Sequence, residues 1–246
     1  MKYLLHILIL STVCITNGNA QEAELPQRKN TIKLDLTSHL FFSKAFVFSY
    51  ERVMKPHQTL VVTAGYQEFQ PFSNLGANIV VTDDKSATGL KFGADYRFYL
   101  QKENKFAAPH GVYIGPYLSY LNFNNTRELE IDNNGTPETA ELSTNLHIFN
   151  IGFQLGYQFV INDRWTIDMV FVGPSISNYR INMDIDGYTG NPEDIQNDII
   201  KALIDRFPAF EDLIRDKSIS GSGKSNSWSY GYRYQLQVGY RFGKKK

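Results

Sequence analysis

Oxygen-bearing side chains between Asn182 and Glu193 follow the spacing of an EF-hand calcium loop. The ligand positions of such a loop correspond to Asn182, Asp184, Asp186, Tyr188 and Glu193, and its glycine corresponds to Gly187. Calcium prefers carboxylate and carbonyl oxygens, so these residue types suit the ion. The first position carries Asn where Asp is usual, and no helix is expected before it. Calcium is therefore a candidate ligand, a solvated turn is the alternative, and no other cofactor is predicted.

A looser version of the same spacing precedes this segment. It consists of Glu130, Asp132, Asn134, Gly135 and Glu141. The alternative interpretation is an Asn-Gly turn at the tip of an extended hairpin, because this dipeptide favours tight two-residue turns.

Histidines are the next candidates for chemistry, and the chain has five of them. A lipid-modifying barrel enzyme would need a histidine close to a serine and an acid at the membrane rim. His39 and His147 are the candidates, because both are expected at outer strand ends. Neither begins a His-x-Ser motif like that of the eight-stranded lipid-A deacylase, and no zinc, phosphate-loop or dinucleotide motif is found. The sequence therefore predicts a protein that is not an enzyme.

The elements that would position these residues are strands. Large apolar side chains occupy every second position from Phe149 to Phe159, while Asn, Gly and Gln fill the gaps. A period of two indicates a strand with two chemically different faces. Eight such strands are predicted, at about 31–40, 45–53, 59–69, 88–100, 111–123, 144–160, 165–181 and 228–242. Pro116 and Pro174 are expected to cause bulges or kinks.

Charged and amide side chains share the polar faces of these strands. The candidates for the barrel interior, or lumen, are Lys33, Asp35, His39, Glu51, Lys91, Asp95, Arg97, Gln154, Gln158, Asp168, Arg233 and Arg241. An eight-stranded barrel leaves an interior just wide enough for side chains. Both signs of charge are nearly balanced, and buried charges are tolerated only when paired. The sequence predicts a plugged, ion-paired lumen, with a narrow proton or ion path as the alternative.

Three features favour a barrel whose apolar faces point to lipid. The predicted strands are long enough for the ~9–11 residues that a membrane-spanning strand needs. The turns on one side (55–58, 101–110 and 162–164) are shorter than the connections on the other (70–87, 124–143 and 182–224), as in outer-membrane barrels. Aromatic residues such as Trp165 and Trp228 lie near strand ends, which suits a lipid–water boundary. The alternative is a soluble secreted barrel that carries an apolar ligand inside.

The predicted organisation has three parts. Residues 1–20 read as a signal peptide, with a basic start, an apolar core and cleavage after Ala20. Residues 21–30 form a periplasmic N-terminal segment, and residues 31–246 form the barrel. Cys14 is the only cysteine, so no disulfide is expected in the mature chain. Within the long outer loop, 182–224, a stripe that includes Ile195 and Ile199 predicts an amphipathic helix at about 192–216, packed as a cover on the barrel mouth. A partner surface or a membrane-lying helix is the alternative for this stripe.

Five segments carry a resemblance to a known family. They read NTIKLDLTSHLFF, SYERVMKPHQTLVVTAGYQEF, GADYRFYL, APHGVYIGPYLSY and FNIGFQLGYQFVINDRWTIDMVF. They are similar to an uncharacterised outer-membrane β-barrel family, a domain of unknown function common in Bacteroidota. The resemblance implies a small barrel like those of OmpA or OmpW, and it implies no activity.

These observations predict an all-β fold, namely an eight-stranded antiparallel transmembrane β-barrel with a helical insertion in the last outer loop. We expect an outer-membrane protein that acts through its extracellular loops in envelope integrity, adhesion or partner binding. Its expected partners are outer-membrane lipid and an unknown protein at the outer loops. The formal net charge is zero, which gives no argument for nucleic acid.

Overall fold

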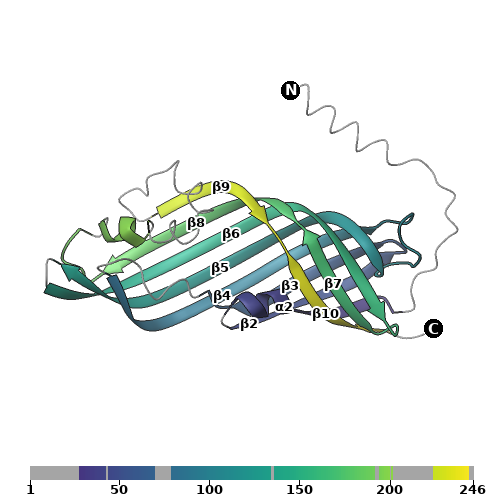
Figure 1. Ribbon diagram of the computed structural model, residues 1–246, viewed down its shortest axis with the longest axis horizontal. Helices are drawn as coiled ribbons and strands as arrows, with labels where there is room; N and C mark the ends of the chain where they lie inside the picture. The colour runs from purple at the N-terminus through teal and green to yellow at the C-terminus, as the bar shows by residue number, and fades with distance from the viewer. Residues whose placement is uncertain are drawn as a thin grey trace, which may run out of the picture.

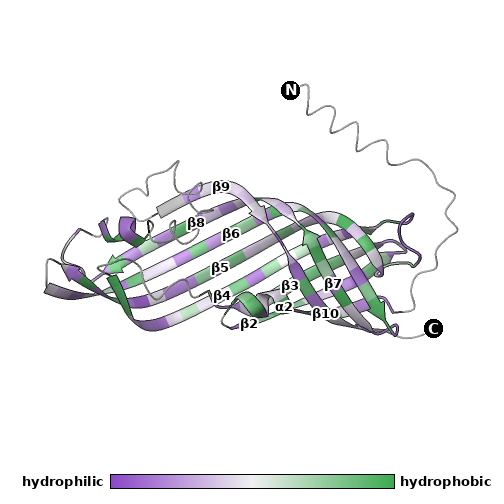
Figure 2. Ribbon diagram, in the orientation of Figure 1, coloured by the Kyte–Doolittle hydropathy of each residue, from purple (hydrophilic) through white to green (hydrophobic). Residues whose placement is uncertain are grey.

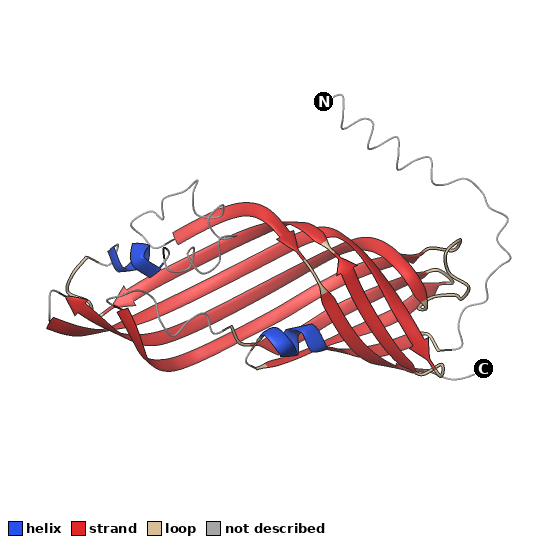
Figure 3. Ribbon diagram, in the orientation of Figure 1, coloured by secondary structure: helices blue, strands red, loops and turns tan. Residues whose placement is uncertain are grey.

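The computed structural model is an antiparallel β structure whose described part contains ten strands, the short helix α2 and a helical segment at residues 194–199 (Figures 1 and 3). It describes residues 28–42, 44–69, 79–133, 136–191, 194–199, 201 and 224–243. The elements are β1 (Asn30–Asp35), α2 (Leu36–Phe41), β2 (Ala45–Lys55), β3 (Gln58–Gln67), β4 (Ile79–Tyr99), β5 (Gly111–Asn133), β6 (Thr136–Ile161), β7 (Trp165–Val172), β8 (Pro174–Asp186), β9 (Lys224–Tyr232) and β10 (Gln235–Phe242).

Eight strands close into a ring. The order is β1-β2-β3-β4-β5-β6-β7-β10, and β10 pairs with β1 to complete it. β8 continues β7 after Gly173, and β9 runs into β10 through Arg233 and Tyr234. The chain therefore makes eight passes, as the alternation predicted, and the kink predicted at Pro174 coincides with the break between β7 and β8. A closed ring pairs every strand on both edges, which leaves no open edge within it.

Five passes continue well beyond the ring on one side (Figure 1). β6 shows how this occurs, because it pairs with β7 from Leu155 onward and with β8 before Gly152. We call the projecting part the extension, and it comprises residues 79–88, 122–133, 136–147, 179–186, 194–199 and 224–227. The remaining strand residues are called the barrel.

The barrel is apolar outside and polar inside. On β5, Ile114 and Leu118 point outward and are each 45% exposed, whereas the inward-facing Tyr113 is fully buried. On β6, Phe153 is 68% exposed while the neighbouring Gln154 is buried. The face predicted to be apolar between Phe149 and Phe159 is therefore the outer one.

The extension has the opposite arrangement on the same strands. Further along β5, the outward positions carry Glu128 and Glu130, while the inward-facing Leu129 and Ile131 are buried. Figure 2 shows the hydropathy along the strands of both parts. The apolar cluster inside the extension consists of Ile79, Leu129, Ile131, Ala140, Leu142, Met183, Ile195 and Ile199.

Residues 194–199 are helical and cover this cluster with Ile195 and Ile199. The remainder of the helix predicted at 192–216 lies almost entirely outside the described residues, as do the predicted signal peptide and residues 21–27. No helix in the described part of the chain is both long and apolar enough to cross a membrane.

Two sequence predictions need correction. The first strand, predicted to reach residue 40, ends at Asp35, because the Asp35 side chain accepts a hydrogen bond from the Ser38 backbone N–H at 3.1 Å and starts α2. The outer connections are also shorter than predicted, because β4, β5, β6 and β8 run into them. β8, for example, extends to Asp186.

Candidate functional site

A network of buried charges fills the middle of the barrel. The Lys33 ammonium lies 2.8 Å from the Glu51 carboxylate and 2.5 Å from the Asp168 carboxylate. The Arg97 guanidinium lies 2.5 Å from the same Asp168 oxygen. All four side chains are at most 1% exposed. Burial of these charges is tolerable because each has an opposite partner at contact distance.

Neutral donors and acceptors complete this network. The Tyr113 hydroxyl donates to Asp168 at 2.6 Å, and the Gln158 amide donates to Glu51 at 2.9 Å. The Tyr99 hydroxyl donates to Gln158 at 3.1 Å. Gly156 lies beneath the Tyr113 ring, and a Cβ at this position would clash with the end of that ring. The small residues between the apolar positions of β6 therefore leave room for side chains that cross the interior.

A second layer of charge lies toward the extension. The Arg233 guanidinium contacts the two Asp95 carboxylate oxygens at 2.9 and 3.1 Å, and the Lys91 ammonium contacts Asp35 at 3.0 Å. The Gln235 amide donates to Asp35 at 2.8 Å and so connects the two pairs. Asp95 also contacts Arg97 at 3.3 Å, which joins this layer to the deeper one. The two layers hold four cations and four carboxylates, and their formal charge cancels.

A cavity of about 270 Å³ lies next to the second layer. Its lining comes from α2 and from strands on all sides of the barrel interior, including Lys91, Asp95, Tyr117, Asn150 and Arg233. The Arg233 guanidinium lies 4.8 Å from the centre of the Tyr117 ring, a cation–π distance. This cavity separates the buried charges from the extension.

The opposite end of the barrel carries its own ion pairs. Asp163, in the turn after β6, contacts Arg241 at 3.0 Å and Arg28 at 3.2 Å. His57 lies in the turn after β2, and burial lowers its pKa. Burial and the nearby Arg241 charge lower the pKa of His110 in the next turn on this side. The Asp163 ion pairs therefore join the turn after β6 to β10 and to the residues before β1.

The structure places the predicted interior residues as follows. Lys33, Glu51, Arg97, Gln158 and Asp168 meet in the deeper layer, and Asp35, Lys91, Asp95 and Arg233 meet in the second. Gln154 is buried on the inner face of β6, and Arg241 lies at the far end. His39 lies outside both layers, in α2, because the predicted strand ends before it.

Tyr113 and Tyr117 are interior residues that the sequence did not single out. Their strand alternates Tyr with Ile and Leu, so both of its faces read as apolar. The signal for their burial is the register with β6, since Tyr113 pairs with Gly156 and Tyr117 pairs with Gly152. Small partners at these positions leave room for large inward side chains.

Three of the five predicted calcium ligands lie on extended backbone. Asn182, Asp184 and Asp186 belong to β8, where the Asn182 amide donates to Asp184 at 3.1 Å. Tyr188 packs against the apolar cluster of the extension, and Glu193 lies outside the described residues. Across the described ranges, no three His, Cys, Asp or Glu side chains are grouped so that they could hold a metal ion. The calcium site stays a prediction.

The two candidate catalytic histidines lie apart from the charged interior. The His39 Nδ1 atom lies 3.2 Å from the Ala45 carbonyl oxygen, and the His147 Nδ1 atom lies 2.7 Å from the Tyr120 hydroxyl. The rings of His147 and Tyr120 are also stacked. Neither set of contacts brings a serine and an acid to the histidine.

Comparisons with known proteins place the chain in a family. A search among curated proteins finds no match. Among solved structures, a major outer membrane protein from Thermus thermophilus matches with a TM-score of 0.34 and 10% identity, over 87% of this chain and 98% of that one. A likeness of this extent carries no conclusion about this chain. The family model described as "Protein of unknown function (DUF3575)" matches residues 6–184. The predicted membership in a family of unknown function is confirmed, and the chain belongs to the DUF3575 family.

Proposed function

We propose that the protein is a non-enzymatic outer-membrane β-barrel with a plugged polar interior. It acts through its extension in envelope integrity, adhesion or the binding of a partner protein. The observation that carries this proposal is a change along single strands. Their outward-facing side chains are apolar in the barrel and polar in the extension. A strand that passes from lipid into water must exchange apolar for polar residues on its outer face.

The reversal occurs at one level on neighbouring strands. Tyr120 on β5 pairs with Phe149 on β6, Phe149 pairs with Asn178 on β8, and Asn178 pairs with Trp228 on β9. The next outward positions toward the extension carry Asn122, His147, Arg180 and Asn226. Three of the four residues in the first row, Tyr120, Phe149 and Trp228, are aromatic, which suits the lipid–water interface, whereas β8 is already polar there with Asn178.

The thickness of the apolar band also fits a membrane. On β5 it runs from about residue 111 to 121, which matches the ~9–11 residues that a tilted membrane-spanning strand needs. At the other end of the barrel, Trp165 and Tyr240 pack at 5.3 Å between ring centres, and the Arg164 guanidinium donates to the Tyr240 hydroxyl at 2.6 Å. A second aromatic boundary with polar partners is expected where the strands leave lipid.

The charged interior argues against a soluble carrier of apolar ligands. Such a carrier needs an apolar inner face, whereas the barrel holds Lys33, Glu51, Arg97 and Asp168 there. The same ion pairs fill the cross-section, so we expect no open pore. A lipid-modifying enzyme is the second candidate, and the contacts of His39 and His147 give it no support.

Gel migration of the refolded mature chain, boiled against unboiled, tests the proposal together with fractionation of cells that express it. We expect a heat-dependent shift, recovery in the outer membrane and no steady conductance in a planar bilayer. A soluble periplasmic protein without a shift would contradict the barrel proposal. A stable open channel would contradict the plugged interior, and a changed lipid-A mass spectrum on deletion of the chain would favour the enzyme.

A further inference from the structure

The last pass of the chain, β9 followed by β10, extends further than β1, its neighbour in the ring. β1 ends at Asp35, where α2 turns away, whereas β9 runs on into the extension. β9 pairs with β8 along one edge, and no strand within the described ranges pairs with its other edge. α2 takes the place that a longer β1 would occupy, and its Thr37 hydroxyl accepts a hydrogen bond from the Leu236 N–H at 2.7 Å. At this point, α2 thus forms the barrel wall in place of a strand paired with β9.

The cavity next to the second charged layer reaches the outer surface here. Tyr232 and Tyr234, on either side of the break between β9 and β10, both line it. They are also 54% and 66% exposed on the outside of the barrel. Residues of the cavity lining are thus also exposed on the outer surface, and they lie beside the edge of β9 that pairs with no described strand, which points to a sideways opening within the apolar band. On the α2 side it is lined by Phe42, which stacks on Phe123 at 5.8 Å.

The cations on the charged side of the cavity are more exposed than the carboxylates with which they pair. The side chains of Lys91 and Arg233 are 20% and 18% exposed, whereas those of their partners Asp35 and Asp95 are 0% and 2% exposed. Asp35 and Asp95 also line the cavity, but the cations present more of their surface to it. A ligand in the cavity meets an ammonium and a guanidinium first, and both groups bind phosphate or carboxylate oxygens.

The rest of the lining is mixed. Phe42, Leu121 and Ile148 supply apolar surface, and Ser119 and Asn150 supply hydrogen-bonding groups. The volume of about 270 Å³ lies just below the ~300 Å³ at which pockets for whole small molecules begin. It accommodates a head group and the start of a chain, while the remaining chain would lie against the exposed tyrosines in lipid.

We propose that this cavity binds an amphiphile with an anionic head group, drawn sideways from the surrounding membrane. The head group lies against Lys91 and Arg233. The hydrocarbon chain leaves beside the edge of β9 that pairs with no described strand, and it lies against Tyr232 and Tyr234, whose rings pack at 4.7 Å between centres. This inference rests on the proposed membrane location, because the opening faces lipid only if the apolar band does.

Binding of dodecyl phosphate to the refolded full mature chain in dodecyl maltoside tests the inference. The first variant is the double substitution R233Q/D95N, which removes a cation together with its carboxylate and so keeps the buried charges in balance. We expect its affinity for dodecyl phosphate to fall about tenfold or more, since a hydrogen bond to a charged group contributes roughly 1.5–3 kcal/mol. K85A removes a cation from the outer face of the extension and should leave the affinity unchanged.

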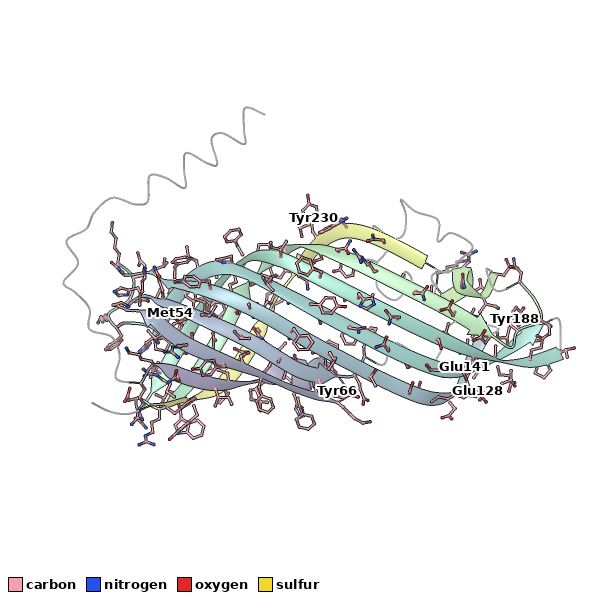
Figure 4. All side chains as sticks on the ribbon, turned by 180° about the vertical axis from the view of Figure 1, so that it is seen from behind. Met54, Tyr66, Glu128, Glu141, Tyr188 and Tyr230 are labelled. Carbon is pink, nitrogen blue, oxygen red and sulfur yellow. The ribbon has the colours of Figure 1, made fainter. Side chains whose placement is uncertain are left out.

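The second variant tests the opening. Tyr232→Ala removes a side chain at the mouth of the cavity, and Tyr230→Ala is its matched control. Tyr230 lies on the same outward face of β9, is 89% exposed and does not line the cavity (Figure 4). We expect Tyr232→Ala to weaken binding and Tyr230→Ala to leave it unchanged. Both are exposed positions, so neither substitution should prevent folding, and the heat-dependent gel shift verifies this.

The outcomes separate this inference from the proposed function. A heat-shifting barrel that does not bind dodecyl phosphate overturns the inference and leaves the barrel proposal intact. Inorganic phosphate binding as tightly as dodecyl phosphate shows a site for a free anion and overturns the amphiphile. Equal binding of dodecyl phosphocholine overturns the anionic specificity. Absence of the heat shift overturns both proposals.

Discussion

The barrel and the extension are built from the same strands and bury opposite kinds of side chain. On β5, the barrel exposes Leu118, and the extension exposes Glu130 while it buries Leu129. Both parts are extended, antiparallel β structure. The difference is the one that the proposed membrane boundary requires, because apolar surface is stable against lipid and must be covered in water.

Lys33 and Lys85 show the same difference between the barrel and the extension. Lys33 in the barrel contacts Glu51 and Asp168, and its side chain is fully buried. Lys85 in the extension contacts Glu128 at 3.2 Å and Glu141 at 2.8 Å, and its side chain is 41% exposed. Glu128 and Glu141 come from adjacent strands of the extension (Figure 4). Each lysine thus contacts two carboxylates. The contacts of Lys33 are buried, whereas those of Lys85 are exposed to water.

The largest effect is expected from Lys33→Met. The substitution leaves Glu51 with the more distant Arg97 guanidinium, at 3.8 Å, and removes one of the two cations that contact Asp168. Removal of one member of a buried pair costs about 3–5 kcal/mol, because the remaining charge stays desolvated. The measurement is the urea midpoint of the heat-dependent gel shift for the variant and the wild type.

A paired substitution serves as the control for Lys33→Met. Lys33→Met combined with Glu51→Gln removes one charge of each sign, and we expect it to recover much of the lost stability. If Lys33→Met alone leaves the urea midpoint unchanged, the ion pairs do not hold the barrel interior together.

Phe153→Arg should have the next largest effect, and it tests which surface faces lipid. Phe153 is 68% exposed on the barrel, so an arginine there would face hydrocarbon at a cost of about 2–4 kcal/mol near the middle of the bilayer. Val80 is its matched control, because it is 53% exposed on the extension. We expect Phe153→Arg to lower the recovery of heat-shifting protein in lipid vesicles and Val80→Arg to leave it unchanged. Equal behaviour of the two variants would contradict a membrane boundary between the two parts.

Leu129→Ala probes the apolar cluster of the extension. Leu129 is fully buried there, and a Leu→Ala substitution in a core costs about 2 kcal/mol or more. We expect faster proteolysis of the extension and an unchanged heat shift, because the barrel closes without it. Limited proteolysis in detergent, read by mass spectrometry, checks this. A loss of the heat shift would show that the two parts fold as one unit.

The sequence predicted the eight passes and the outward face of the barrel, since the two faces of the barrel strands differ consistently in polarity. It did not predict the extension. β4 is irregular between Val81 and Asp83 and again between Asp84 and Ser86, which disrupts the period of two. In the sequence alone, polar outward residues such as Glu128 and Glu130 also indicate a loop, because the burial of their neighbours is known only from the structure. A pattern of period two reports a strand only when its two faces differ consistently.

The residue types of the candidate site could be predicted, but their partners could not. Lys33 and Asp168 are 135 positions apart in the chain, and they meet because β1, β10 and β7 are adjacent in the ring. That adjacency and the stagger between strands are set by closure of the whole barrel. The cavity depends on α2, and the only sequence signal for α2 is Asp35 three residues before Ser38. Asp35 was assigned to the polar face of a strand, so this capping signal was missed.

The smallest effect is expected from Lys85→Ala, the counterpart of Lys33→Met in the extension. Water replaces much of the interaction between an exposed lysine and its carboxylates, so we expect no measurable change in proteolysis of the extension at neutral pH. The hydrogen bonds to Glu141 and then Glu128 raise the pKa of Lys85 in the folded protein. Any stabilisation is therefore fully present below the ordinary lysine pKa and is lost only as the pH rises through the raised value. Neutral pH is consequently the condition under which a difference between wild type and Lys85→Ala would be largest. A clear loss of protease resistance in Lys85→Ala at that pH would show that the contacts of Lys85 with Glu128 and Glu141 stabilise the extension more than an exposed ion pair usually does.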